Sequence, residues 1–69
     1  MEVRFTKHIK DRMKRRQISE EEIINTIKNS NKTSKIGRKF YAQKDIGRAN
    51  IEVVYEKDKY INIITVHYI

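Results

Sequence analysis

Two histidines and a group of arginines are the residues of this chain that could perform chemistry on a phosphate. His8, Arg12 and Arg15 are spaced so that on a helix they fall within about 60° of one another. A histidine can transfer a proton near neutral pH, and an arginine can bind two phosphate oxygens at once. We therefore expect proton transfer or phosphate binding by His8 and phosphate binding by Arg12. A solvated basic helix face with one surface histidine is the alternative.

The second histidine, His67, lies in the segment 60–69, whose alternating pattern predicts a strand. Strict alternation assigns its residues to two faces, which are Ile61, Ile63, Thr65, His67 and Ile69 on one and Tyr60, Asn62, Ile64, Val66 and Tyr68 on the other. Polar Thr65 and His67 indicate a change from core to site near the end of the strand. An edge strand whose end reaches water is the alternative.

A third group of candidate residues interleaves basic and aromatic side chains on and beside a predicted strand. Its members are Arg38, Lys39, Tyr41, Lys44 and Arg48. Such a strand can contact phosphates through its cations while the tyrosine stacks on a base. The same residues are also common on exposed sheets that only need solubility.

Other chemistries have little support in the sequence. With two histidines and no cysteine, a zinc site is not expected, and we predict no metal and no cofactor. The sequence contains no phosphate-binding loop, dinucleotide-binding glycine pattern or nucleophile elbow. The acidic run Glu20 to Glu22 is explained by capping of a helix.

The elements that must position these residues begin with two helices. Thr6 is a typical N-cap for a helix from Lys7 to Arg16, whose Ile9 and Met13 stand four residues apart on one face. Ser19 followed by Glu22 forms a capping box for a second helix, which the polar residues 29–33 end.

Strands are expected in the rest of the chain. The segments 40–42, 51–55 and 60–69 have high β propensity, and charged or glycine-containing turns at 45–48 and 56–59 separate them. Residues 2–5 alternate and could add a short first strand. The sequence thus predicts one α+β domain over residues 1–69, with two N-terminal helices on a three- or four-stranded antiparallel sheet.

The net charge of +7 is concentrated in two segments. Residues 1–16 and 28–48 hold the whole surplus of positive charge. We expect one positive surface if the first helix packs beside the first meander strand, and such a surface favours a polyanion. A merely soluble basic surface is the alternative. The missing cysteines and the charged first residues favour a cytoplasmic protein with no membrane partner. The oligomeric state is not predicted.

The helical segment resembles that of a known protein family. The run His8-x-x-x-Arg12-Met13-x-x-Arg16-x-Ile18-Ser19-x-Glu21-Glu22 is similar to a family of short proteins of undetermined function related to RelE/ParE-like toxins and to BrnT. The ending Val53-Val54-Tyr55 and Ile63-Ile64-Thr65-Val66 resembles the last two strands of that family. This resemblance spans nearly the whole chain, and it departs at Gln17, where the family usually has glycine.

The resemblance implies a RelE-like fold and a toxin that cleaves RNA without a metal, often on the ribosome, under the control of a small antitoxin. It marks His8, Arg12 and Arg16 as recurrent polar positions. We expect His8 and His67 to act as acid and base and Arg12, Arg15 and Arg16 to bind phosphate, with Lys39 and Tyr41 in support. The alternative is a module that binds nucleic acid or inhibits a protein without catalysis.

Overall fold

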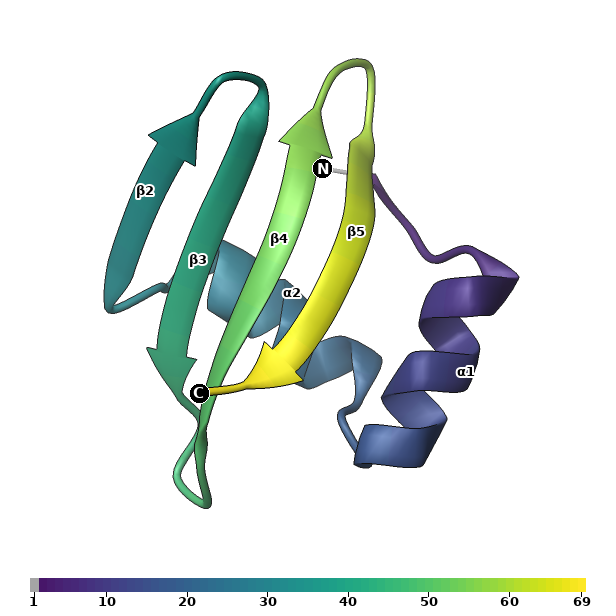
Figure 1. Ribbon diagram of the computed structural model, residues 1–69, viewed down its shortest axis with the longest axis vertical. Coiled ribbons are helices and arrows are strands. Elements are labelled where there is room, and N and C mark those ends of the chain that lie inside the picture. Colours follow the sequence, from purple (N-terminus) through teal and green to yellow (C-terminus); the bar gives the residue numbers. More distant parts are fainter. Residues whose placement is uncertain (1) are drawn as a thin grey trace.

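The computed structural model describes residues 2–69, which form two helices and five strands (Figure 1). In chain order the elements are β1 (Val3–Arg4), α1 (Lys7–Arg16), α2 (Glu20–Lys28), β2 (Lys32–Ile36), β3 (Lys39–Asp45), β4 (Asn50–Lys57) and β5 (Ile61–Tyr68). The α+β class is therefore confirmed, although a strand precedes the helices.

The two helices begin where their capping residues predict. Thr6 accepts a hydrogen bond from the Ile9 backbone N–H and starts α1. Ser19 and Glu22 exchange the two reciprocal hydrogen bonds of a capping box and start α2. Both caps satisfy N–H groups that the first turn of a helix leaves without a partner. Gln17, the first of the three residues between the helices, has a left-handed backbone with φ of 56°.

The sheet has more strands than expected and is mixed. Its strand order is β1-β5-β4-β3-β2, and β2 to β5 run antiparallel. The expected three- or four-stranded antiparallel sheet is wrong in two respects. β1 pairs parallel with β5, where Val3 lies opposite Ile61, and β2 adds a strand where a polar end to the second helix was expected.

The sequence did not predict β2 because this strand has no apolar face. All five of its residues, Lys-Thr-Ser-Lys-Ile, are exposed. Its existence depends on pairing with β3 in a hairpin whose turn contains Gly37 at φ of 62°. A residue with a Cβ rarely adopts this backbone, so the glycine suits the turn.

A β-bulge changes the face on which the later residues of β5 lie, compared with the expected strict alternation. Opposite β4 the register shifts between Val54 and Tyr55, which pair with Thr65 and Ile63, so Ile64 has no partner. Beyond the bulge the alternation reverses, and Val66 joins Ile61 and Ile63 in the core. Strict alternation is therefore wrong for the second half of the strand.

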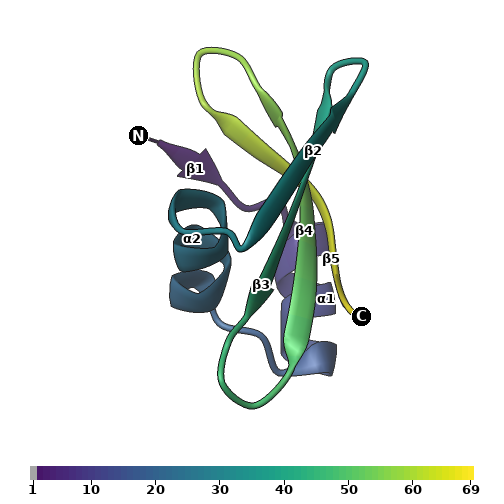
Figure 2. The ribbon, with the colours of Figure 1, turned by 90° about the vertical axis from the view of Figure 1, so that its left-hand side faces the viewer.

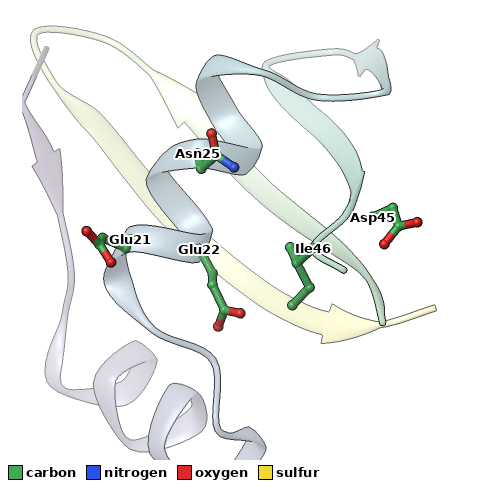
Figure 3. A pocket seen from close by; sticks show the side chains of 5 residues that line it. All are labelled: Glu21, Glu22, Asn25, Asp45 and Ile46. Atoms are coloured by element: carbon green, nitrogen blue, oxygen red, sulfur yellow. The ribbon is translucent and has the colours of Figure 1, made fainter. Parts of the chain in front are cut away.

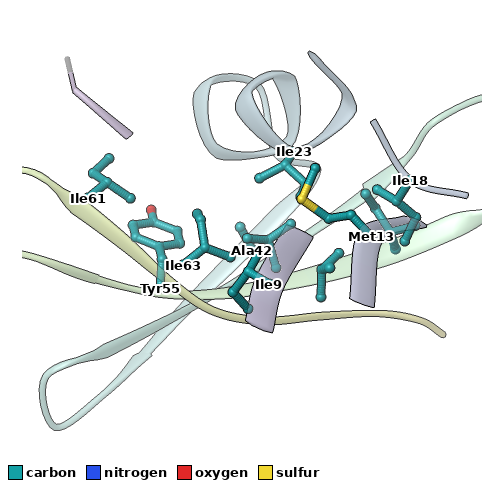
Figure 4. Packing of buried hydrophobic residues seen from close by; sticks show 11 residues of the cluster. Ile9, Met13, Ile18, Ile23, Ala42, Tyr55, Ile61 and Ile63 are labelled. Carbon is teal, nitrogen blue, oxygen red and sulfur yellow. The ribbon is translucent and has the colours of Figure 1, made fainter. Parts of the chain in front are cut away.

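The core lies between the helices and one face of the sheet (Figure 4). Ile9 and Met13 come from α1, Ile18 from the interhelical turn and Ile23 from α2. They meet a layer of sheet residues that includes Ala42, Ile51, Val53, Tyr55, Ile61, Ile63 and Val66. We call the opposite side of β3 to β5 the outer face; it carries Tyr41, Gln43, Glu52, Val54, Thr65 and His67.

The helices occupy different parts of the sheet. α2 packs against β3 and β4 on the core side, whereas α1 packs against β5 at its edge (Figures 1 and 2). One joined positive surface was expected if α1 packed beside β3, the first meander strand. This expectation is wrong, because α1 packs against β5 and β4 separates β5 from β3. The basic residues of α1 and of β2 thus lie toward opposite edges of the sheet.

Within residues 2–69, neither helix combines the length and the apolar character that crossing a membrane requires.

Replacing a core isoleucine tests the packing. Ile23 is fully buried, so Ile23→Ala should lower the free energy of unfolding by about 2–5 kcal/mol through lost burial and the cavity left behind. Ile36→Ala is the matched control, because the Ile36 residue is 68% exposed. Urea titration of both variants should show a large shift only for Ile23→Ala, and equal shifts would contradict the placement of the core.

Candidate active site at the junction of α1 and β5

Arg12 links α1 to the outer face of β5. Its Nη1 donates a hydrogen bond to Thr65 Oγ1 at 3.0 Å, and its Nη2 lies 3.3 Å from His8 Nε2. Arginine can only donate, so in this contact His8 Nε2 is the acceptor. The helical spacing of His8 and Arg12 therefore correctly predicted that these two side chains are neighbours. They lie at the edge of the junction between the helix and the sheet.

Arg16 lies one turn further along α1 and binds the same strand. It donates a hydrogen bond to the backbone carbonyl of Val66. At this point β5 has no neighbouring strand on its free side, since β1 pairs only with its first residues. Arg16 therefore supplies a donor to an edge carbonyl, and fewer of its N–H groups remain for the phosphate that we expected it to bind. Arg15 is exposed on the same helix.

The second histidine belongs to a polar row across the outer face. His67 Nε2 lies 3.1 Å from Glu52 Oε1, and Gln43 Nε2 donates to Glu52 Oε2 at 3.0 Å. Glu52 is largely buried, with 16% of its side chain exposed, while His67 is 37% exposed. The carboxylate thus fixes the orientation of an accessible imidazole, as an orienting group does for a catalytic base.

The Arg12–Thr65 contact and His67 involve neighbouring parts of β5. Thr65, which holds Arg12, and His67 are two residues apart on the same face, which corresponds to about 7 Å along a strand. The sequence pattern predicted Thr65 and His67 at a site, but it did not indicate Glu52 and Gln43. Their signal was the cross-strand register, which pairs Glu52 with both His67 and Gln43.

The basic and aromatic residues of β3 are spread out. Tyr41 lies on the outer face opposite Val54, whereas Arg38 and Lys39 lie at the exposed β2–β3 turn. Lys44 Nζ donates to the backbone carbonyl of Asn29 at 2.8 Å. The structure therefore does not gather these residues around Arg12.

Arg48 is part of a separate cluster. Its Nε and Nη2 donate to the two oxygens of Glu22 at 3.2 and 3.0 Å, and Nη2 also donates to the Gln17 carbonyl at 2.6 Å. Nη1 donates to the Tyr68 hydroxyl at 3.0 Å, which in turn donates to the Arg16 carbonyl. The donors of this expected phosphate ligand are thus engaged by other parts of the chain, and Arg48 joins the β3–β4 loop to both helices and to β5.

The chain matches one family of known proteins. Residues 5–68 match the family described as a domain of unknown function, DUF4258. The chain belongs to this family. No curated protein and no solved structure matches it. Both histidines, Arg12 and the Arg48 cluster lie within the DUF4258 domain.

Two open hollows of the DUF4258 domain are lined by residues other than the histidines. One, of about 560 Å³, is lined by Glu21, Glu22, Asn25, Asp45 and Ile46 (Figure 3). A second, of about 700 Å³, lies beside it at the α1–α2 turn and Arg48. The carboxylates of the first hollow repel phosphate, so neither its position nor its charge suits the chemistry expected at His8 and Arg12.

No cluster of three or more potential metal ligands occurs among the described residues 2–69.

The Arg48 cluster generates a prediction about acid stability. Hydrogen bonds from the Arg48 side chain, and secondarily from the Ser19 backbone, hold the pKa of Glu22 below its ordinary value of 4.5. A carboxyl with a lowered pKa in the folded state stabilises the fold above its unfolded pKa, and this contribution is lost as the pH falls through the folded pKa. Glu22→Gln should therefore destabilise the domain at pH 7, and the difference from wild type should shrink below about pH 4.5.

Urea titrations of wild type and variant at a series of pH values check this. Glu21→Gln is the matched control because Glu21 lies in the same helical turn and is exposed. A deficit for Glu22→Gln that stays constant from pH 7 into the acid range would contradict the assignment.

Proposed function

We propose that this DUF4258 domain binds RNA at the junction of α1 and β5 and cleaves it without a metal, as a toxin-type endoribonuclease. The observation that carries the proposal is the position of Arg12, which Thr65 and His8 hold at an accessible edge. An arginine fixed in this way is oriented in advance for a phosphate, and a preformed donor stabilises the charge that develops during phosphoryl transfer.

The proposed reaction uses the 2′-hydroxyl of the RNA as nucleophile. Its oxygen forms a bond to the adjacent phosphorus while the bond from phosphorus to the 5′-oxygen breaks. His67 accepts the 2′-hydroxyl proton: with Nε2–H directed to Glu52, Nδ1 carries the lone pair. The 5′-oxygen leaves with a proton from His8.

In this proposal, Arg12 couples phosphate binding to the hydrogen bonding of His8 Nε2. In the free domain an N–H of Arg12 points to His8 Nε2. A bound phosphate replaces His8 as the acceptor, because a charged oxygen accepts more strongly than a neutral nitrogen. Both nitrogens of His8 are then free to hold a proton, as a general acid requires. Arg15 and part of Arg16 would add positive charge around the RNA, and Tyr41 on the outer face could stack on a base.

The proposal extends to the fold family and to the partners. Two helices packed on a largely antiparallel sheet support a RelE-like assignment, as does the resemblance of the α1 segment. In that case the domain acts in the cytoplasm on RNA or the ribosome and is neutralised by a small antitoxin. Gln17 adopts the left-handed backbone that glycine favours, which accounts for the family's usual glycine at this position.

A non-catalytic module that binds nucleic acid or inhibits a protein is the second candidate. It is favoured by the spread of Lys39, Tyr41 and Lys44 along β3, which are not gathered around His8 and Arg12 as a compact catalytic set would be. Growth of cells that express the domain separates the two candidates. Arrest that disappears in His8→Ala while RNA binding survives favours catalysis, and arrest that no histidine substitution changes favours the binding module.

Substitution of the central pair tests catalysis directly. His8→Ala and Arg12→Ala should each lower the rate of RNA cleavage by about 100-fold or more, since general acid catalysis and charge stabilisation each contribute at this scale. Cleavage of labelled RNA, with and without translating ribosomes and in the presence of a metal chelator, is the measurement. Lys10→Ala, on the exposed part of the same helix, should cleave like wild type. RNA left intact by the wild-type domain under all these conditions would refute the enzyme.

The salt dependence of RNA binding tests the position of the contact surface. Each phosphate contact contributes roughly −0.7 to the log–log salt slope for a single strand. Replacing Arg12 and Arg15 together by Ala should therefore reduce the magnitude of the slope by roughly one to two units. Lys57 and Lys59, at the β4–β5 turn, form the control pair, whose replacement should have little effect. Equal effects of the two pairs would mean that total charge governs binding.

A further inference from the structure

The far edge of the sheet has an unused set of backbone hydrogen-bonding groups. β2 is the last strand in the order and pairs only with β3. All five of its residues are exposed, and its sequence contains no proline. About half of the N–H and C=O groups of such a strand point away from the sheet and are free to pair with another strand.

The side chains of β2 are positively charged on both faces. Lys32 lies opposite Gln43 and so belongs to the outer face, while Lys35 lies opposite Phe40 on the core side, with its Nζ 5.2 Å from the centre of that ring. The stretch from residue 23 to residue 44 contains no acidic residue. Ile36 adds an exposed apolar side chain on the outer face, at the end of the strand next to the turn.

We propose that the β2 edge is a docking site for an extended acidic segment of a partner protein, which adds to the sheet as a further strand. Main-chain pairing supplies affinity in this mode, and side chains at alternate positions supply specificity. The proposal is independent of the proposed RNA cleavage, which concerns β5, toward the opposite edge of the sheet.

Charge complementarity selects this occupant over a second copy of the chain. Two β2 strands side by side would bring four lysines together along one short interface, and like charges across a pair of strands are unfavourable. An acidic strand instead places carboxylates opposite Lys32 and Lys35. A nucleic acid would neutralise the same lysines but could not use the free N–H and C=O groups as a paired strand does.

The register of β2 defines the sequence that fits best. Residues directly opposite each other in a sheet share a face, so the carboxylates must stand three residues apart, as Lys32 and Lys35 do, and project to opposite faces. A β-branched apolar residue next to one of them then lies opposite Ile36. In the antiparallel direction this reads Val-Glu-Thr-Thr-Glu from the N-terminus.

A blocked peptide Thr-Val-Glu-Thr-Thr-Glu-Val is therefore the probe. Titrated into the full isotope-labelled chain, it should shift the amide signals of residues 32–36 and slow hydrogen exchange of the β2 amides that point away from β3. The matched control peptide has proline at the central threonine, which keeps the charge but removes a donor and disrupts pairing. It should bind at least 10-fold more weakly.

The matched protein variants are Lys32→Glu with Lys35→Glu, which should weaken peptide binding at least 10-fold, and Lys57→Glu with Lys59→Glu, which should not. Equal binding of the two peptides would overturn the proposal, because charge alone would then explain binding. It would also be overturned by hexauridylate binding the β2 amides more tightly than the peptide, or by sedimentation showing a dimer of the wild-type chain that the peptide cannot dissociate.

Discussion

The guanidinium of Arg48 connects the parts of this fold that have few other contacts. It holds the Glu22 carboxylate at the start of α2, the Gln17 carbonyl between the helices and the Tyr68 hydroxyl at the end of β5. Tyr68 in turn donates to the Arg16 carbonyl at the end of α1. These bonds join both helices to the β3–β4 loop and to β5, so Arg48, together with the core contacts of α1, sets the angle between the helices and the position of α1 along β5. Hydrogen bonds to Glu22 and to Tyr68 raise the pKa of Arg48, and a guanidinium is in any case always protonated in proteins.

This constraint places the candidate site. α1 has only Ile9 and Met13 in the core, which is a small apolar contact for a helix at the edge of a sheet. Arg12 and Arg16 complete the attachment by hydrogen bonds to Thr65 and to the Val66 carbonyl. The same residues that fix the helix thus also carry the positive charge, and a phosphate at Arg12 would compete with contacts that hold α1 in place.

Signals between residues close in sequence predicted the helices and part of the site. The features that depend on contacts between distant residues could not be predicted. The caps at Thr6 and Ser19 involve residues three apart, and the pair His8 and Arg12 needs only the helical repeat. β2 could not be predicted because its residues carry no apolar pattern, and the bulge at Ile64 could not because alternation assumes a regular strand. Glu52 beside His67 and the ligands of Arg48 depend on register and on loop position, which arise only when the whole chain packs.

The pairing of β1 with β5 has a consequence for the order of folding. β1 is the first element of the described chain and β5 is the last, with Val3 opposite Ile61. The hydrogen bonds of β1 can form only after nearly all of the chain has been synthesised, although α1 and α2 can close their caps much earlier. Contacts this distant in sequence are slow to form because a long loop must close first. The nascent domain thus passes through a stage in which the residues of α1 have been synthesised while the strand on which the helix will pack is still missing.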